Sequence, residues 1–145
     1  MSNFSLRFPL DEIPRWAATY NYPQGDAEAI EIGAAAKSQG YLMRPQFLAL
    51  AHWKSARPAK HHVKSDDATV EEVTRFAFTT PVEPLRLSVL TLLKGVHIRT
   101  ASAILHLCHC DPYPLMNVRA LWSMGCDEEP KDWVAVWTEY TAECR

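Results

Sequence analysis

The chain has no long apolar run and no leader of the kind that directs secretion. No segment approaches the roughly 18 consecutive apolar residues that a membrane-spanning helix needs, which predicts no contact with a membrane. The first residues, MSNFSLRFPLDEIPRW, lack the basic stretch followed by an apolar stretch that marks a secretory signal. We therefore expect a cytoplasmic protein, in which the four cysteines are free thiols rather than a disulfide framework.

Strand-like alternation bounded by Asn-Gly or Asp-Gly turns is also missing. So are internal repeats and any linker long enough to divide 145 residues into two domains. Helical periodicity is present instead, and it predicts a single all-α domain over residues 1–145, a compact bundle of about eight short helices. The expected helices cover residues 12–20, 26–38, 45–54, 69–78, 84–93, 98–108, 118–124 and 130–143, with a basic loop at residues 57–64.

Capping residues and prolines set the expected helix starts. Asp26 is expected to cap the second helix, and Thr69 and Glu72 have the spacing of a capping box for the fourth. Proline is harmless in the first turn of a helix, because an N–H group there has no intrahelical partner. Three further helices are therefore expected to open at Pro45, Pro84 and Pro130.

Positive charge is concentrated in the middle of a chain whose formal net charge is −2. Residues 44–99 hold nine lysines and arginines against five acidic residues, whereas residues 100–145 hold three against seven. A nucleic-acid partner needs a local basic patch rather than a basic protein as a whole. The middle of the chain is therefore the candidate for such a patch.

A glycine-centred turn joins two apolar helices within residues 92–105. A tight turn followed at once by a helix N-terminus directs backbone N–H groups at one point, which suits a phosphate oxygen. An ordinary helical hairpin without a ligand is the structural alternative. The predicted phosphate contacts are Lys94, Gly95, Val96, His97, Arg99 and Thr100.

Two segments resemble the helix-hairpin-helix DNA glycosylase superfamily, the endonuclease III-like proteins. They are residues 93–105, LKGVHIRTASAIL, and residues 113–119, YPLMNVR, and the overlap covers about residues 90–122. The resemblance implies an all-α fold and, as partner, double-stranded DNA with a damaged or modified base. It also implies that the protein flips this base into a pocket and cleaves its N-glycosidic bond.

Two positions depart from the pattern of the superfamily. The position of the nucleophilic lysine of bifunctional members holds Arg99, which stays protonated and cannot attack as an amine. The position of the aspartate that stabilises charge on the sugar holds Asn117, which has neither charge nor basicity. The resemblance therefore implies base excision without lyase activity. The alternative is a catalytically degenerate helical module that binds DNA or another protein.

A second basic segment follows the third expected helix. Lys54, Arg57 and Lys60 suit contacts with phosphates, and Trp53 is expected either to stack on a base or to close the core. Lys54 is also the best remaining amine for catalysis. The predicted catalytic residues are thus Asn117, Arg99 and Lys54.

The remaining histidines, cysteines and large aromatic residues have structural interpretations. His106, Cys108, His109, Cys110 and Cys126 lack the spacing of zinc ligands, and the iron–sulfur ligands of some superfamily members are absent, so neither a metal nor a cofactor is expected. Since superfamily members often continue with further helix, a C-terminal part of the domain is expected beyond residue 145 or from a partner. The core is expected to contain Trp16, Trp122, Trp133, Trp137, Phe47 and Phe76.

Overall fold

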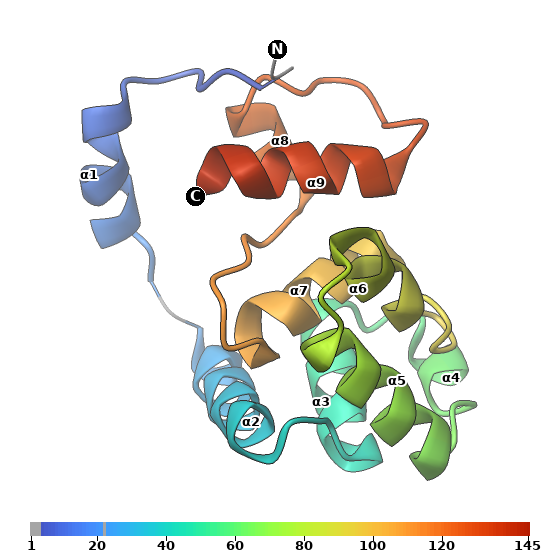
Figure 1. The fold of residues 1–145 in the computed structure, drawn as a ribbon. Helices are drawn as coiled ribbons and strands as arrows, with labels where there is room; N and C mark the ends of the chain where they lie inside the picture. The colour runs from blue at the N-terminus through green and yellow to red at the C-terminus, as the bar shows by residue number, and fades with distance from the viewer. Residues whose placement is uncertain (1–3, 22) are drawn as a thin grey trace.

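The computed structural model describes residues 4–21 and 23–145, and within these residues it contains only helices and the segments that connect them (Figure 1). The all-α prediction is therefore confirmed. None of the helices in this part of the chain has the length and apolar character needed to cross a bilayer. In chain order the elements are a 3₁₀ turn Leu10–Glu12, α1 Ile13–Ala18, α2 Gln24–Gln39, α3 Arg44–Lys54, α4 Ala59–His62, α5 Asp67–Thr79, α6 Glu83–Leu90, α7 Ile98–Cys108, α8 Val118–Ser123 and α9 Trp133–Cys144.

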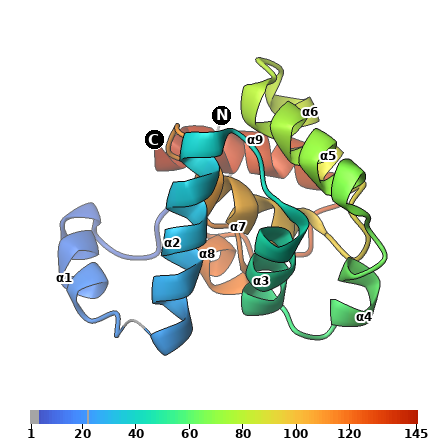
Figure 2. The same ribbon diagram turned by 90° about the horizontal axis from the view of Figure 1, so that it is seen from below.

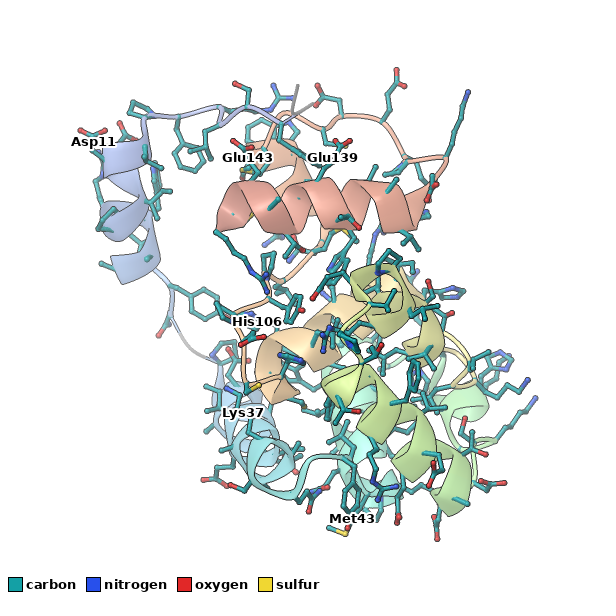
Figure 3. The ribbon with its side chains drawn as sticks, viewed as in Figure 1. Asp11, Lys37, Met43, His106, Glu139 and Glu143 are labelled. Carbon is teal, nitrogen blue, oxygen red and sulfur yellow. The ribbon has the colours of Figure 1, made fainter. Side chains whose placement is uncertain are left out.

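Helix α7 is the centre of the fold. It packs against α2, α3 and α6, and Figure 2 shows it enclosed between them. Residues 100–105 of α7 are all buried, because this helix has neighbours on several sides. The crossing with α2 is close, since a Cβ atom added to Gly33 would lie 2.4 Å from the carbonyl oxygen of Leu107. Figure 3 shows Lys37 of α2 beside the C-terminal end of α7.

An extended segment, residues 109–117, leads from α7 to α8 under α9 (Figure 1). His106, labelled in Figure 3, donates from Nδ1 to the carbonyl oxygen of Tyr113 at 2.7 Å. The Tyr113 ring stacks on Trp137 of α9 with 5.4 Å between centroids. The backbone N–H of Met116 donates to the Ser102 hydroxyl at 3.1 Å. These contacts fix the position of the next residue, Asn117, relative to α7.

The N-terminal helix α1 stands apart from the bundle (Figure 1). Neither it nor the preceding 3₁₀ turn contains a buried residue, and Trp16 is 50 % exposed. Trp122 and Phe76 are also exposed, at 54 % and 45 %. The core prediction was therefore wrong for these three side chains. It was confirmed for Trp137 and Phe47, which are fully buried, and Trp133 packs against the core while half-buried.

Prolines predicted the helix starts better than polar capping residues did. Pro45 and Pro84 lie in the first turns of α3 and α6, as expected. The other three expectations were wrong. Asp26 lies inside the first turn of α2 rather than capping it, Asp66 rather than Thr69 caps α5, and Asp132 caps α9 two residues after Pro130. The expected basic loop contains the short helix α4, whose four residues give no periodic signal.

Candidate functional site

The glycine-centred turn between α6 and α7 is fixed against α4. Gly95 has φ +78°, and a Cβ atom added there would lie 2.8 Å from Cδ2 of His62. His62 is buried and donates from Nε2 to the Gly95 carbonyl oxygen at 3.2 Å. Burial is the main cause that lowers the pKa of His62, so the neutral ring is the form that supports the turn. The backbone N–H of Lys94 donates to the Ser65 hydroxyl at 2.9 Å, and Val96 is buried.

The first turn of α7 is free of such partners. The backbone N–H groups of Ile98, Arg99 and Thr100 have no hydrogen-bond acceptor among the described residues, and the His97 side chain does not cap the helix. The positive end of a helix with free donors is a favourable place for an anion. Donors without an acceptor among the described residues therefore lie at this helix start and also in the turn before it, at the N–H groups of Gly95 and His97.

A cavity of about 760 Å³ opens beside this first turn. Its walls come from the end of α3, the starts of α7 and α8, the loop before α9, and α9 itself. Five residues predicted from the sequence line it together: Lys54, His97, Arg99, Thr100 and Asn117. The other lining residues are Ser55, Ile98, Val118, Arg119, Glu129 and Trp133.

The remaining predicted residues lie outside this cavity. Gly95, Val96 and Lys94 belong to the turn, and Arg57 and Lys60 are exposed beside and within α4 without an ion pair in the described part of the chain. Trp53 faces another side of α3. Its Nε1 donates to Asp26 at 2.9 Å, and the buried Asp26 carboxylate also accepts from the Tyr20 hydroxyl. Trp53 was expected either to stack on a base or to close the core, and this arrangement favours the second role.

Asn117 caps α8. Its Oδ1 accepts a hydrogen bond from the backbone N–H of Ala120 at 2.8 Å. Asparagine is among the most favourable N-cap residues, so the position has a structural reason for an oxygen at this place. With Oδ1 engaged, the group of Asn117 that remains for a ligand in the cavity is its amide NH₂.

Arg99 and Lys54 form a coupled pair in the cavity wall. The Arg99 guanidinium lies 5.1 Å from the centre of the Trp133 ring, within range of a cation–π contact. Its Nε is buried without a hydrogen-bond partner among the described residues. Burial lowers the pKa of Lys54, and the charge of Arg99 lowers it further. Lys54 therefore gives up its proton more readily than a free lysine.

Among the lining residues with a charged or aromatic side chain, three were not predicted as site residues: Arg119, Glu129 and Trp133. Trp133 was assigned to the core. Glu129 stands in an acidic run, Asp127–Glu129, of the kind that usually covers a solvated loop. Only the position of this loop beside α7 makes it part of the cavity, and no local pattern predicts that contact.

A second polar cluster lies at the C-terminal end of α7, where His109 follows the helix, and its residues do not line the cavity. Arg86 is buried, donates to His109 Nε2 and pairs with Glu83 at 3.4 Å. The backbone nitrogen of Asp111 lies 2.9 Å from His109 Nδ1. His109, Cys110 and Asp111 bring their ligand atoms within 4.8 Å of one another, but both ring nitrogens of His109 are already engaged. Burial and then Arg86 lower the pKa of His109, as expected for a neutral ring in a structural cluster.

Comparison of the chain with protein-family models, with curated proteins and with solved structures gave no match.

Proposed function

We propose that the chain binds double-stranded DNA at the start of α7 and takes a damaged or modified base into the adjacent cavity. In this proposal it belongs to the helix-hairpin-helix DNA glycosylase type and excises the base without lyase chemistry at Arg99. The observation that carries the proposal is the cavity, because it joins Asn117, Arg99 and Lys54, which were singled out from separate parts of the sequence.

The charge of this region supports an anionic partner. Lys54, Arg99 and Arg119 line the cavity against a single carboxylate, and the free N–H groups of α7 add the positive end of a helix. Outside the cavity, Lys94, Arg57 and Lys60 are exposed on the turn and around α4. Together these groups suit a DNA backbone that passes the turn while one nucleotide enters the cavity.

Binding without turnover is the second candidate, and one observation favours it. Asn117 offers no carboxylate, and its oxygen is engaged in the cap of α8. A chain that retained DNA contact but lost excision would have the same surface charge and cavity.

The test measures binding and chemistry separately. Binding is followed by fluorescence anisotropy on a duplex that contains one tetrahydrofuran abasic-site analogue. Excision is followed as alkali-sensitive strand breaks in duplexes that contain uracil, hypoxanthine, 8-oxoguanine or 3-methyladenine.

The proposal expects tighter binding to the analogue duplex than to its unmodified counterpart, and base release from at least one duplex, faster in Asn117→Asp. If wild type and Asn117→Asp both bind the duplex and neither releases a base, the second candidate holds, a protein that binds DNA without excising a base. No binding at low salt would overturn both candidates, because phosphate contacts are strongest there.

A further inference from the structure

The cavity beside α7 contains one carboxylate. Among its lining residues only Glu129 is acidic, and it lines the cavity together with Lys54, Arg99 and Arg119. Glu129 is exposed and has neither an ion pair nor a hydrogen bond to another described residue. Its carboxylate is thus available to a ligand, unlike the oxygen of Asn117.

The loop that carries Glu129 is fixed on both sides of it. Before it, Asp127 pairs with Arg7, and the carbonyl oxygen of Glu128 accepts from the Cys126 thiol. After it, Asp132 accepts from two backbone N–H groups at the start of α9. Asp127 and Asp132 therefore have structural partners, and Glu128 does not line the cavity. Of the four acidic residues in this loop, Glu129 alone is both in the cavity and without a partner among the described residues.

We propose that Glu129 is the catalytic carboxylate of this site and acts as the general base for hydrolysis of an N-glycosidic bond. The inference rests on the proposed function and assigns its chemistry to a residue outside the segments that resemble the glycosylase superfamily. A carboxylate is the group that this reaction needs, because positive charge builds on the sugar as the base departs. Asn117 cannot supply it, because an amide neither accepts the proton nor carries the charge.

The reaction balances with water as the only co-reactant. Glu129 takes a proton from a water molecule, whose oxygen forms a bond to C1′ of the sugar. The bond between C1′ and the base nitrogen breaks, and its electron pair leaves with the nitrogen. That nitrogen takes up a proton from the ammonium group of Lys54, which lines the cavity. Proton transfer through solvent from Glu129 to Lys54 then restores both groups.

The experiment compares Glu129→Gln with its neighbour Glu128→Gln. Base release is measured in single turnover on duplexes with uracil, hypoxanthine, 8-oxoguanine or 3-methyladenine, and affinity on the tetrahydrofuran duplex. Loss of a general base should reduce the rate of release by about 100-fold, whereas Glu128→Gln should keep the wild-type rate. Affinity in both variants should equal or exceed that of wild type, because each removes a negative charge near a polyanion.

One further readout separates catalysis from a structural effect. In the Glu129→Gln background, Asn117→Asp should restore part of the rate by returning a carboxylate to the cavity.

Two results would overturn the role of Glu129 and leave the proposed function intact. One is base release by Glu129→Gln at the wild-type rate, and the other is an equal fall in rate in Glu128→Gln. If wild type binds the duplexes but releases no base, both the catalytic role of Glu129 and base excision are overturned. Absence of duplex binding would overturn the proposed function itself.

Discussion

The turn at residues 93–97 and the first helical turn at residues 98–100 are adjacent in the chain and differ in how their polar groups are used. In the turn, Ser65 and His62 occupy backbone groups, and the space beside Gly95 is filled by His62. In the first turn of α7 the backbone N–H groups of Ile98, Arg99 and Thr100 have no acceptor among the described residues, and a cavity opens beside them. Gly95 therefore fixes the fold through its contact with His62, and the helix start that follows it is the part that opens on the cavity.

The difference changes how variants should be interpreted. A substitution in the turn is expected to change the free energy of unfolding. A substitution at the start of α7 is expected to change affinity for a ligand while the fold remains intact.

Gly95→Ala is expected to destabilise the protein by roughly 3 kcal/mol, since it combines a positive φ with overpacking against His62. Gly40→Ala is the matched control. Gly40 has φ +84°, but a Cβ atom there would meet nothing within 4 Å, so only the backbone strain of about 1 kcal/mol is expected. Urea unfolding of both variants measures the difference, and equal losses would show that the contact with His62 does not hold the turn.

Acidification is expected to weaken the fold through its buried histidines. In the folded protein the pKa values of His62 and His109 lie below the ordinary value for histidine. At a pH between the folded and the unfolded pKa, the unfolded chain therefore binds more protons than the folded protein does. Stability is then complete above about pH 6.5 and falls as pH drops below it. Each histidine contributes at most about 1.4 kcal/mol per pH unit.

Urea unfolding at pH 7.5 and pH 5.5 tests this dependence. His62→Gln should reduce the loss of stability that wild type shows between the two conditions. If His62→Gln loses as much stability as wild type between pH 7.5 and pH 5.5, protonation of His62 is not the cause of the loss.

Lys54 is expected to react as an amine at lower pH than a free lysine, because burial and Arg99 lower the pKa of Lys54. Limited acetylation of Lys54 across a pH series, read by mass spectrometry against Nα-acetyl-lysine amide as the reference amine, gives its titration. Arg99→Gln should move this titration to higher pH. If Lys54 titrates with the reference amine in wild type, burial and Arg99 do not lower its pKa.

The exposed cations around α4 are expected to give the smallest effect. The double variant Arg57→Ala, Lys60→Ala should weaken binding of the tetrahydrofuran duplex modestly. It should also reduce the slope of log affinity against log salt by about one for each phosphate that these side chains neutralise. A slope equal to that of wild type would place these residues outside the DNA interface.

Much of the fold followed from local patterns. The bounds of α7 agree with the expectation of residues 98–108, because a positive-φ glycine and a strongly apolar helix leave few alternatives. Asp26 was misassigned because a carboxylate near a helix start resembles a cap, whereas its partners, Trp53 and Tyr20, come from other elements. Trp16 was misassigned because an apolar pattern does not reveal whether a neighbouring helix covers it.

The candidate site was predictable only where it lies in or next to recognisable segments. Arg99 and Asn117 were found through residues 93–119, and Lys54 through its basic surroundings. Glu129 and Trp133 enter the cavity because the loop between α8 and α9 and the first residue of α9 lie beside the start of α7. Such a tertiary contact has no signature in the local sequence.

The central claim is that the start of α7 and its cavity hold the DNA, and one measurement tests it most directly. Affinity for the tetrahydrofuran duplex is compared between wild type, Arg99→Ala and Lys37→Ala, with the fold of each checked by urea unfolding. Each variant removes one positive charge from the molecule. Arg99 lies at the start of α7 and lines the cavity, whereas Lys37 lies on α2 beside the C-terminal end of α7. We predict about a tenfold loss of affinity for Arg99→Ala, as for one charge-assisted contact, and no change for Lys37→Ala. Equal affinities in the two variants, with both proteins folded, would contradict the claim.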